Sequence, residues 1–496
     1  MRSVAPYLAL ALITAGLPLA AGGIYGVLLY YSGGDYREYV VGYQLGLAGA
    51  LLVALGYLAS RVRTGPIRPG EGVLATTLVW LFVPIITGIP LAEALGIPLI
   101  DAIFESASGW TTTGLTIFNG KPSSWESVYV PSIDELPSSV KLWRGLIQWL
   151  GGLGIIVFTI AFLARPGISA ALLYLAEGRF ERLEASLKRT ATKMGIIYVT
   201  LTVISVALFK IGGLTWEDSV IHALTGIATG GFSTRQESMS FYLESDFILA
   251  VALFTAFLGA SNFADHYNVL TLRPGRLRES VELKAQLLLI ALFLAAVYLA
   301  YNRDAVLREA YTMKQAVFDT ISALLNVGFQ TGNLGDAPDT FKFLVLLATI
   351  IGGSAFSTAG GIKILRVVIA AKIVKIQALE TIKPPGYTPN RRLGKYMVDE
   401  HLEKATISVV SSFFALYGLI VASLLMLYPG RYPLDDLLLE SASAVFNMGE
   451  STGITGAESP VGMKILFIGA MLFGRVEILP FIIAVFYLAD RAKRML

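Results

Sequence analysis

The sequence predicts an all-α polytopic membrane protein in which two extra N-terminal helices precede four tandem helix–pore loop–helix repeats around a central pore. Three observations support this fold class. First, 55% of the 496 residues are hydrophobic and only 15% are charged, whereas a soluble domain carries about 25% charged residues. Second, many apolar stretches reach the ~20 residues needed to cross a ~30 Å hydrocarbon core. Third, a polar motif, here called the polar phrase, occurs as "ESASGWTTTGLTIF" at 105–118 and again as "ESASAVFNMGESTG" at 440–453.

The apolar stretches divide the chain into an N-terminal extension and four units. The first run, residues 4–31, is too long for a cleaved signal peptide, so we expect a retained span. The predicted boundaries are 1–70 for the extension and 71–165, 166–275, 276–380 and 381–496 for the repeats. The predicted first spans are 72–96, 193–213, 283–302 and 405–429, the short helices 100–110, 217–228, 315–325 and 435–446, and the second spans 142–164, 246–270, 341–375 and 462–490.

Basic residues collect in a few segments between the apolar spans, namely 61–70, 165–193, 271–284, 363–404 and 491–496. By the positive-inside rule these segments face the cytoplasm, which predicts a multi-pass protein of the cell (cytoplasmic) membrane embedded in the lipid bilayer. The chain has no cysteine, and its three histidines stand in no HExxH or GxSxG setting. The sequence therefore predicts no enzyme, no organic cofactor and no nucleic-acid partner.

The polar phrase has four copies when the sequence is aligned on a glycine. The aligned glycines are Gly114, Gly231, Gly328 and Gly449. The two preceding positions hold Thr112 and Thr113, Thr229 and Gly230, Asn326 and Val327, and Asn447 and Met448. Nine residues before each glycine stand Glu105, His222, Asp319 and Glu440, and three residues after it stand Ile117, Thr234, Thr331 and Thr452. This register predicts one structural unit that is repeated four times.

The predicted short helices cannot cross a membrane, and each is followed by irregular backbone. Such backbone survives at membrane depth only inside protein or a water-filled cavity, so we expect four re-entrant loops around one axis. Glycine lets the backbone turn its carbonyls inward, and rings of carbonyl oxygens replace the hydration shell of a monovalent cation. The alternative is that the glycines only allow close helix packing, as expected for 151–154.

With these loops in view, the sequence resembles the Trk/Ktr/HKT superfamily of potassium transporters, most closely its TrkH-like branch, over residues 70–490. The resemblance implies potassium uptake, with K⁺ as the transported ion, through a four-loop selectivity filter. The implied filter residues are Thr112, Thr113, Gly114, Thr229, Gly230, Gly231, Asn326, Val327, Gly328, Asn447, Met448 and Gly449. A sodium-permeable (Na⁺/K⁺) member of the superfamily is the alternative. There the first-loop glycine is often serine, whereas Gly114 is present here.

The resemblance also implies a gate below the filter. The stretch "IGGSAFSTAGGIK" (351–363) interrupts a predicted span, and a helix-packing face is the alternative reading. The implied gate residues are Gly352, Gly353, Ser357, Thr358, Gly360, Gly361 and Arg475. Arg475 is expected inside the last span as a pore arginine, the alternative being an arginine locked to an internal acid. Asn262, Asp265 and His266 form a polar group with a structural or gating role.

Two positions depart from the family pattern. Glu450 follows the fourth glycine where a neutral residue is more usual, so its carboxylate either attracts cations or hydrogen-bonds backbone amides. Adjacent Gly230 and Gly231 leave the register of the second loop open by one residue.

The resemblance further implies a homodimer that docks onto a cytosolic, TrkA-like nucleotide-binding regulatory subunit. The basic loops 165–193 and 363–404 are the expected docking surface, and the same loops are expected to contact anionic lipid.

Overall fold

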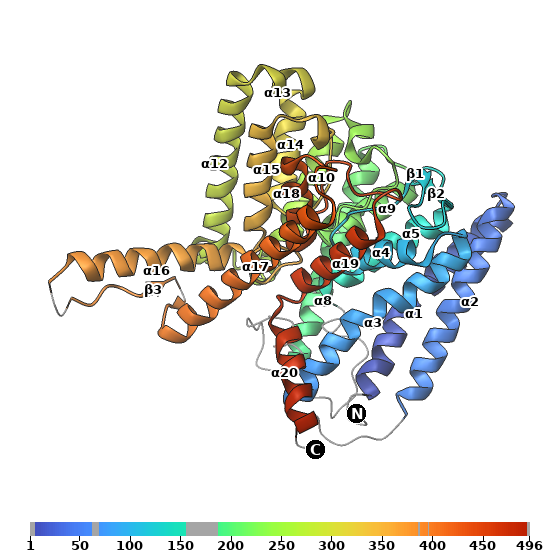
Figure 1. Cartoon of the computed structure of the whole chain (residues 1–496), viewed down its shortest axis with the longest axis horizontal. Helices are drawn as coiled ribbons and strands as arrows, with labels where there is room; N and C mark the ends of the chain where they lie inside the picture. Colours follow the sequence, from blue (N-terminus) through green and yellow to red (C-terminus); the bar gives the residue numbers. More distant parts are fainter. Residues whose placement is uncertain (1–4, 62–68, 155–186, 385–386, 395, 494–496) are drawn as a thin grey trace.

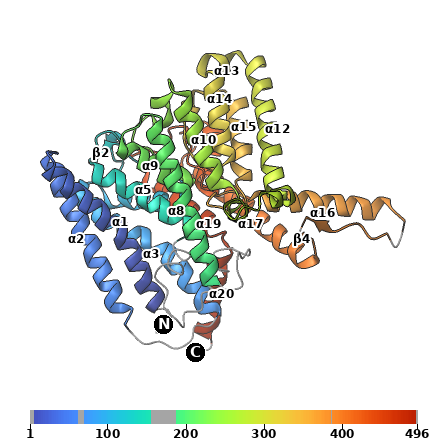
Figure 2. The same ribbon diagram turned by 180° about the vertical axis from the view of Figure 1, so that it is seen from behind.

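The computed structural model describes residues 5–61, 69–154, 187–384, 387–394 and 396–493 (Figures 1 and 2). Within these residues, six helices are long and apolar enough to cross a membrane, or up to eight if each of two bent helix pairs is one span. The described chain is mostly helical, which confirms the predicted all-α polytopic fold class. Most of the basic loop predicted at 165–193 lies outside the described residues, as does the end of the span predicted at 142–164.

The four repeats share an order of three helical elements. The first spans are α3 (Pro69–Leu95), α8 (Leu187–Ile211), α12 (Val281–Arg303) and α17 (Glu400–Leu427). The short helices are α4 (Leu99–Trp110), α9 (Trp216–Ile227), α14 (Met313–Leu324) and α18 (Leu434–Phe446). The second spans begin with α5 (Ser138–Leu153), α10 (Asp246–Ala260), α15 (Asp339–Ile351) and α19 (Val461–Arg475). With 12 or 13 residues, the short helices cover only about two thirds of a ~30 Å core.

The second span of repeat two is broken, and the prediction of one continuous span over 246–270 is wrong. α10 meets α11 (Phe263–Leu270) at an angle of 103°. Ser261 leaves the helix with an extended ψ of 158°, and the Asn262 side chain accepts a hydrogen bond from the N–H of Ala264. This local bond caps α11 and competes with a straight helix.

The last span is also broken, which corrects the prediction of one span over 462–490. α19 meets α20 (Leu479–Lys493) at 95°. Glu477 and Ile478 have positive φ angles of 62° and 60°, and Pro480 has no N–H to continue the helical ladder. Arg475 is therefore the last residue of α19 beside the bend, and not a residue inside a span.

In repeat three the interruption lies where the sequence predicts it. α15 ends at Ile351, and α16 (Ile364–Ile382) begins after a loop at 352–363. α16 extends away from the rest of the molecule together with the start of α17 (Figures 1 and 2).

Short elements that the all-α prediction lacks occupy the connections. β1 (Asn119–Pro122) pairs antiparallel with β2 (Tyr129–Ser132), and β3 (Arg392–Leu393) with β4 (Tyr396–Met397). The other connecting elements are η2 (Ser238–Tyr242), η3 (Pro274–Glu279), α13 (Ala305–Ala310) and η4 (Leu334–Asp336). These elements lie in loops between helices, so they leave the helical architecture unchanged.

The N-terminal extension forms α1 (Ala5–Tyr31) and α2 (Tyr36–Ala59), which pack side by side at one edge of the molecule (Figures 1 and 2). A Cβ on Gly23 would overlap the backbone of Gly46, so small residues allow this close approach. The carboxylate of Glu38 on α2 accepts hydrogen bonds from the N–H groups that begin α5, at 2.6 and 3.3 Å. An acid suits this positive helix end, and it fastens the extension to repeat one.

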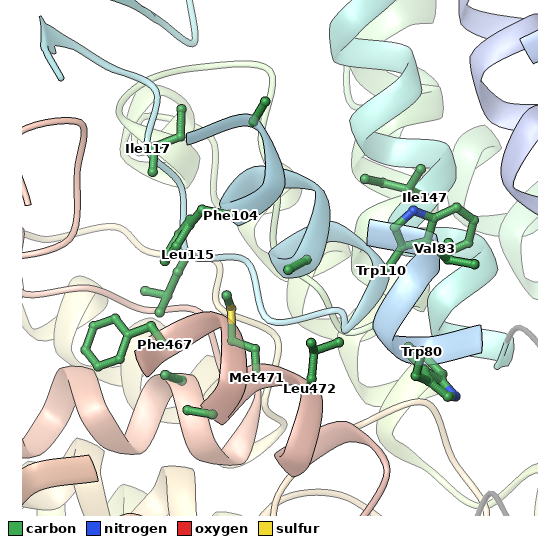
Figure 3. Packing of buried hydrophobic residues seen from close by; sticks show 14 of the residues in the cluster. Trp80, Val83, Phe104, Trp110, Leu115, Ile117, Ile147, Phe467, Met471 and Leu472 are labelled. Carbon is green, nitrogen blue, oxygen red and sulfur yellow. The ribbon is translucent and has the colours of Figure 1, made fainter. Parts of the chain in front are cut away.

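Helix α4 is held by apolar packing against α3, α5 and α19 (Figure 3). Trp110 at the end of α4 is fully buried, and its indole N–H donates to the hydroxyl of Thr87 on α3 at 3.0 Å. Phe467 and Met471 of α19 lie below the segment that leaves α4 (Figure 3). Van der Waals packing and hydrogen bonds of this kind hold membrane helices together, so the end of α4 is rigidly placed.

Ion pairs join neighbouring repeats around the molecule. Lys464, the fourth residue of α19, bonds Asp101 of α4, and both side chains are buried. Lys342, the fourth residue of α15, bonds Asp436 of α18 at 2.6 Å. In each case the second span of one repeat holds the short helix of the next. Because the alternative is a buried unpaired charge, these pairs fix how the repeats are arranged.

Candidate functional site

The four aligned glycines meet in one closed ring. Each glycine faces the carbonyl oxygen of the residue before the glycine of the next loop, so that an added Cβ would overlap that oxygen. The four contacts are Gly114 with Gly230, Gly231 with Val327, Gly328 with Met448, and Gly449 with Thr113. The order runs through the four repeats and returns to the first. Only a residue without a side chain fits this close to a neighbouring carbonyl.

The backbone of the ring repeats in the predicted register. The φ angles are 95°, 73°, 81° and 100° at Gly114, Gly231, Gly328 and Gly449. They are 55°, 51°, 50° and 53° at the residues two positions earlier, Thr112, Thr229, Asn326 and Asn447. A left-handed conformation costs a residue with a side chain about 1–2 kcal/mol, so four occurrences indicate a strong geometric demand. In the second loop the register follows Gly231 rather than Gly230.

The residues nine positions before the glycines fasten the backbone that leaves the ring. They bond groups two or three positions after the glycine, on the same loop. The pairs are Glu105 with the N–H of Ile117 (3.1 Å), Asp319 with that of Thr331 (2.7 Å), Glu440 with that of Thr452 (2.8 Å), and His222 with the hydroxyl of Ser233 (2.9 Å). These bonds explain why the two positions recur together in the sequence.

Two buried side chains of α5, which the sequence analysis does not single out, support the first two loops. Arg144 donates to Glu105 at 2.7 Å and lies 4.0 Å from the ring centre of Phe232. Gln148 donates to the carbonyl of Gly230 at 2.6 Å and accepts from the N–H of Phe232 at 3.1 Å. Their only sequence signal is that polar residues on a membrane helix are expensive unless they find partners.

A cavity of 540 Å³ opens on one side of the ring. All four ring glycines line it, together with polar residues such as Gln330 and Ser451. This volume accommodates a hydrated ion, and its lining offers hydroxyl, amide and backbone groups that can replace water.

On the opposite side, three of the four residues two positions before the glycines carry an oxygen atom without a partner, whereas the hydroxyl of Thr229 is hydrogen-bonded. Within the described chain, Thr112 Oγ1, Asn326 Oδ1 and Asn447 Oδ1 are buried and make no hydrogen bond. The Asn447 amide nitrogen donates to Thr113 Oγ1 at 2.8 Å, so its oxygen is held in place. Buried oxygens of this kind are normally satisfied, and a cation that has lost water is one species that satisfies them.

The loop at 352–361 packs directly against this side of the ring. The N–H of Gly361 donates to the carbonyl of Phe446 at 2.9 Å, and the hydroxyls of Thr358 and Thr229 lie 3.3 Å apart. A cavity of only 40 Å³ remains, lined in part by Gly360, Gly361 and Asn447. This space admits water but is too small for a hydrated cation.

Arg475 bonds carbonyl oxygens at the same level. It donates to the carbonyl of Thr358 at 2.8 Å and to those of Gly151 and Gly152 at 2.6 and 3.1 Å. The guanidinium therefore joins the loop to the end of α5. The nearby acid Glu477 instead forms a bidentate pair with Arg366 of α16, at 2.9 and 2.6 Å.

The polar group around Asn262 also contacts the loop. Asn262 donates to one carboxylate oxygen of Glu282 at 2.6 Å, and the N–H of Ala355 donates to the other at 2.6 Å. Asp265 and His266 make hydrogen bonds nearby. Glu282 is buried on α12, and the sequence does not reveal its role because its partners lie on other elements, at the bend after α10 and in the loop at 352–363.

A family profile described as a cation transport protein, TrkH, matches residues 48–494. The chain belongs to the TrkH family. Membership of this family makes it a membrane transporter and not an enzyme, and it confirms the resemblance seen in the sequence.

Relatives of similar length support this assignment to the TrkH family. The chain is 29% identical over 476 residues to an uncharacterised cation transporter of Methanocaldococcus jannaschii, covering 95% of this chain and 92% of the relative. It is 28% identical over 468 residues to the Trk system potassium uptake protein TrkH of Halomonas elongata, covering 91% and 92%. The crystal structure of the potassium transporter TrkH from Vibrio parahaemolyticus matches with a TM-score of 0.77 at 24% identity, covering 96% and 98% of the two chains. This structure shares the fold.

Proposed function

We propose that this TrkH family member takes up K⁺ across the cytoplasmic membrane through the ring of four glycines, which acts as a selectivity filter. The observation that carries the proposal is the closed contact of each glycine with the carbonyl of the next loop. The similarity to Trk system potassium uptake proteins supports K⁺ as the ion.

The ion enters through the 540 Å³ cavity and exchanges water for protein oxygens at the ring. The backbone oxygens and side-chain oxygens of the residues two and one positions before the glycines supply the ligands. The four short helices end one or two residues before these positions, and their C-terminal ends add partial negative charge. A cation is therefore favoured at the ring and an anion is not.

The loop at 352–361 and Arg475 form the gate in this proposal. The structure has a 40 Å³ cavity below the ring, and conduction requires that the loop move away from Phe446 and Thr229. Arg475 places a positive charge on the path, and its bonds to Thr358, Gly151 and Gly152 hold the loop closed. When those bonds break, the loop is free to move and the guanidinium is free to leave the path, so the steric and the electrostatic barrier are removed at the same time.

We further propose the partners that the sequence implies: a second copy of the chain and a cytosolic, TrkA-like nucleotide-binding subunit. The basic segment at 363–404 supports the docking surface, because α16 and the hairpin β3–β4 extend away from the membrane helices (Figure 1). The basic loop at 165–193 is proposed as the second part of this surface.

Expression in a bacterial strain that lacks potassium uptake tests the proposal. Wild-type protein is expected to restore growth at micromolar K⁺ without added Na⁺. Gly114→Ser is expected to raise Na⁺ permeation relative to K⁺ in flux assays, because it alters the ring at its first loop. Growth that depends on Na⁺, or unchanged ion ratios in Gly114→Ser, would contradict a potassium-selective ring.

A further inference from the structure

The residue that directly follows the ring glycine differs in the fourth loop. In the first three loops it is a large apolar residue, at Leu115, Phe232 and Phe329, with exposed fractions of 1%, 2% and 1%. In the fourth loop it is Glu450, which is 0% exposed. The four equivalent positions are therefore buried beside the ring, and only the fourth of them holds a carboxyl group.

Neither carboxyl oxygen of Glu450 makes a hydrogen bond of normal length within the described chain. Glu450 interacts electrostatically with the carboxylate of Asp319 and with the hydroxyl of Ser322, both on α14. An ionised carboxylate without a partner is among the most expensive groups to bury, and a second acid beside it adds repulsion. A neutral carboxylic acid avoids both costs.

Asp319 has the opposite environment. One of its oxygens accepts from the N–H and the hydroxyl of Thr331, both at 2.7 Å, and the other accepts from the N–H of Gly332 at 3.1 Å. Three donors stabilise a carboxylate, so the negative charge of the pair belongs on Asp319. The same arrangement makes Asp319 the anchor that ties α14 to its loop.

The other titratable groups around the pair add no positive charge. Tyr311, just before α14, interacts with Asp319, Glu450 and the acid Asp336 of η4. Glu440 of α18 is engaged by the hydroxyl of Ser451 and the N–H of Thr452. Among the described residues, Asp319, Glu440 and Glu450 form no ion pair with a lysine or an arginine.

We infer that Glu450 is a proton-binding site behind the fourth filter loop and stands there as a neutral carboxylic acid, while Asp319 holds the negative charge. The bound proton keeps a full charge away from the ring. Conduction requires that an ion bind weakly enough to leave, and an ionised Glu450 would hold the cation in place. The consequence for transport rests on the proposed function, whereas the proton itself does not.

Infrared spectra of the purified protein test the proton directly, because a carboxylic acid and a carboxylate absorb at different frequencies. The wild-type minus Glu450→Gln difference is expected to contain the carbonyl stretch of a protonated acid. Glu309→Gln, which removes an exposed carboxylate on α13, is the matched control and is expected to show only carboxylate bands. Carboxylate bands in the Glu450→Gln difference would overturn the inference. Glu450→Leu, which copies Leu115 of the first loop, serves as a second variant.

Transport gives a second readout. Glu450→Gln is expected to keep the KM for Rb⁺ uptake at neutral pH within about twofold, because an amide replaces an uncharged acid. If Glu450 were ionised, its removal would raise KM at least about tenfold and overturn the inference. Asp319→Asn is expected to lower the unfolding temperature, whereas Glu450→Gln is not, and equal losses would also contradict the assignment. Wild-type protein that transports no Rb⁺ or K⁺ would count against the proposed function and leave the infrared result standing.

Discussion

The side of the molecule with the glycine ring and the side with the proposed gate are built differently. At the ring, all four loops repeat the same φ pattern, and three of them repeat the same bond from a carboxylate of the short helix to the outgoing backbone, which the second loop replaces by a bond from His222 to the hydroxyl of Ser233. On the gate side, the second spans differ: α10 bends by 103°, α19 bends by 95°, and α15 is interrupted by a loop. The four repeats therefore have the same local geometry at the ring, whereas their second spans differ from one another.

This difference follows from what each level is proposed to do. An ion surrounded by oxygens needs equivalent ligands from all sides, so each loop meets the same geometric demand. A gate needs only one segment that can adopt two conformations, so a single loop and a single arginine are enough to close the path. The backbone that leaves the ring is fastened by bonds within each repeat, whereas the loop at 352–361 is bonded to other repeats, as Thr358 is to Thr229 of repeat two and Arg475 of repeat four. We expect substitutions on the two sides to act differently.

Gly114→Ala is expected to have the largest effect and, like Gly114→Ser, to lower K⁺ uptake strongly and to leave a residual flux that is less selective against Na⁺. Its Cβ would overlap the carbonyl of Gly230, where backbone cannot yield cheaply. Gly213→Ala is the matched control, because Gly213 has the same φ of 95° but no atom within 4 Å of an added Cβ. Rb⁺ uptake into proteoliposomes measures both. Equal losses would show that backbone strain, and not the ring contact, limits transport.

Lys464→Met is expected to destabilise the protein by about 3–5 kcal/mol, because it leaves Asp101 buried and charged without its cation. Lys404→Met breaks the exposed pair with Glu400 and should cost no more than about 0.5 kcal/mol. Thermal unfolding in detergent compares the two variants. Similar unfolding temperatures would mean that the buried pair does not hold repeat four against repeat one.

Arg475→Ala is expected to raise cation flux about tenfold, because it removes a charge from the path and charge-assisted bonds worth about 1.5–3 kcal/mol each. Flux is measured in proteoliposomes without any regulatory subunit. Arg475→Lys keeps the positive charge but cannot bond Thr358, Gly151 and Gly152 at the same time. Its flux therefore separates the effect of the charge from the effect of the hydrogen bonds that hold the loop. An unchanged flux in Arg475→Ala would give the arginine a purely structural role.

Glu38→Gln is expected to have the smallest effect, a loss of about 1 kcal/mol of stability, because a neutral amide caps the start of α5 less well. The hydrogen bonds of Glu38 go to the start of α5 and not to the ring or the loop at 352–361, so Rb⁺ uptake should be unchanged. Glu309→Gln on an exposed face is the control for unfolding temperature. A strong loss of uptake would instead make the N-terminal extension part of the transport machinery.

The sequence alone determined the features that depend on local pattern. The short helices, the register of Gly114, Gly231, Gly328 and Gly449, and the interruption at 352–363 were all predictable, because chain flexibility, helix length and hydropathy are properties of neighbouring residues. Family membership followed from the same pattern and is confirmed by the family profile. The role of the ring as a filter remains a prediction.

Only the tertiary structure decided which distant residues support those local features. The bends after α10 and α19 depend on bonds and backbone angles that no apolar periodicity reveals. Gln148 meets Gly230, Glu282 meets Ala355, and Arg366 meets Glu477, each across a long stretch of chain. Burial in a membrane protein makes such polar side chains find partners, but it does not say which ones, because several folds of the same hydropathy would satisfy them.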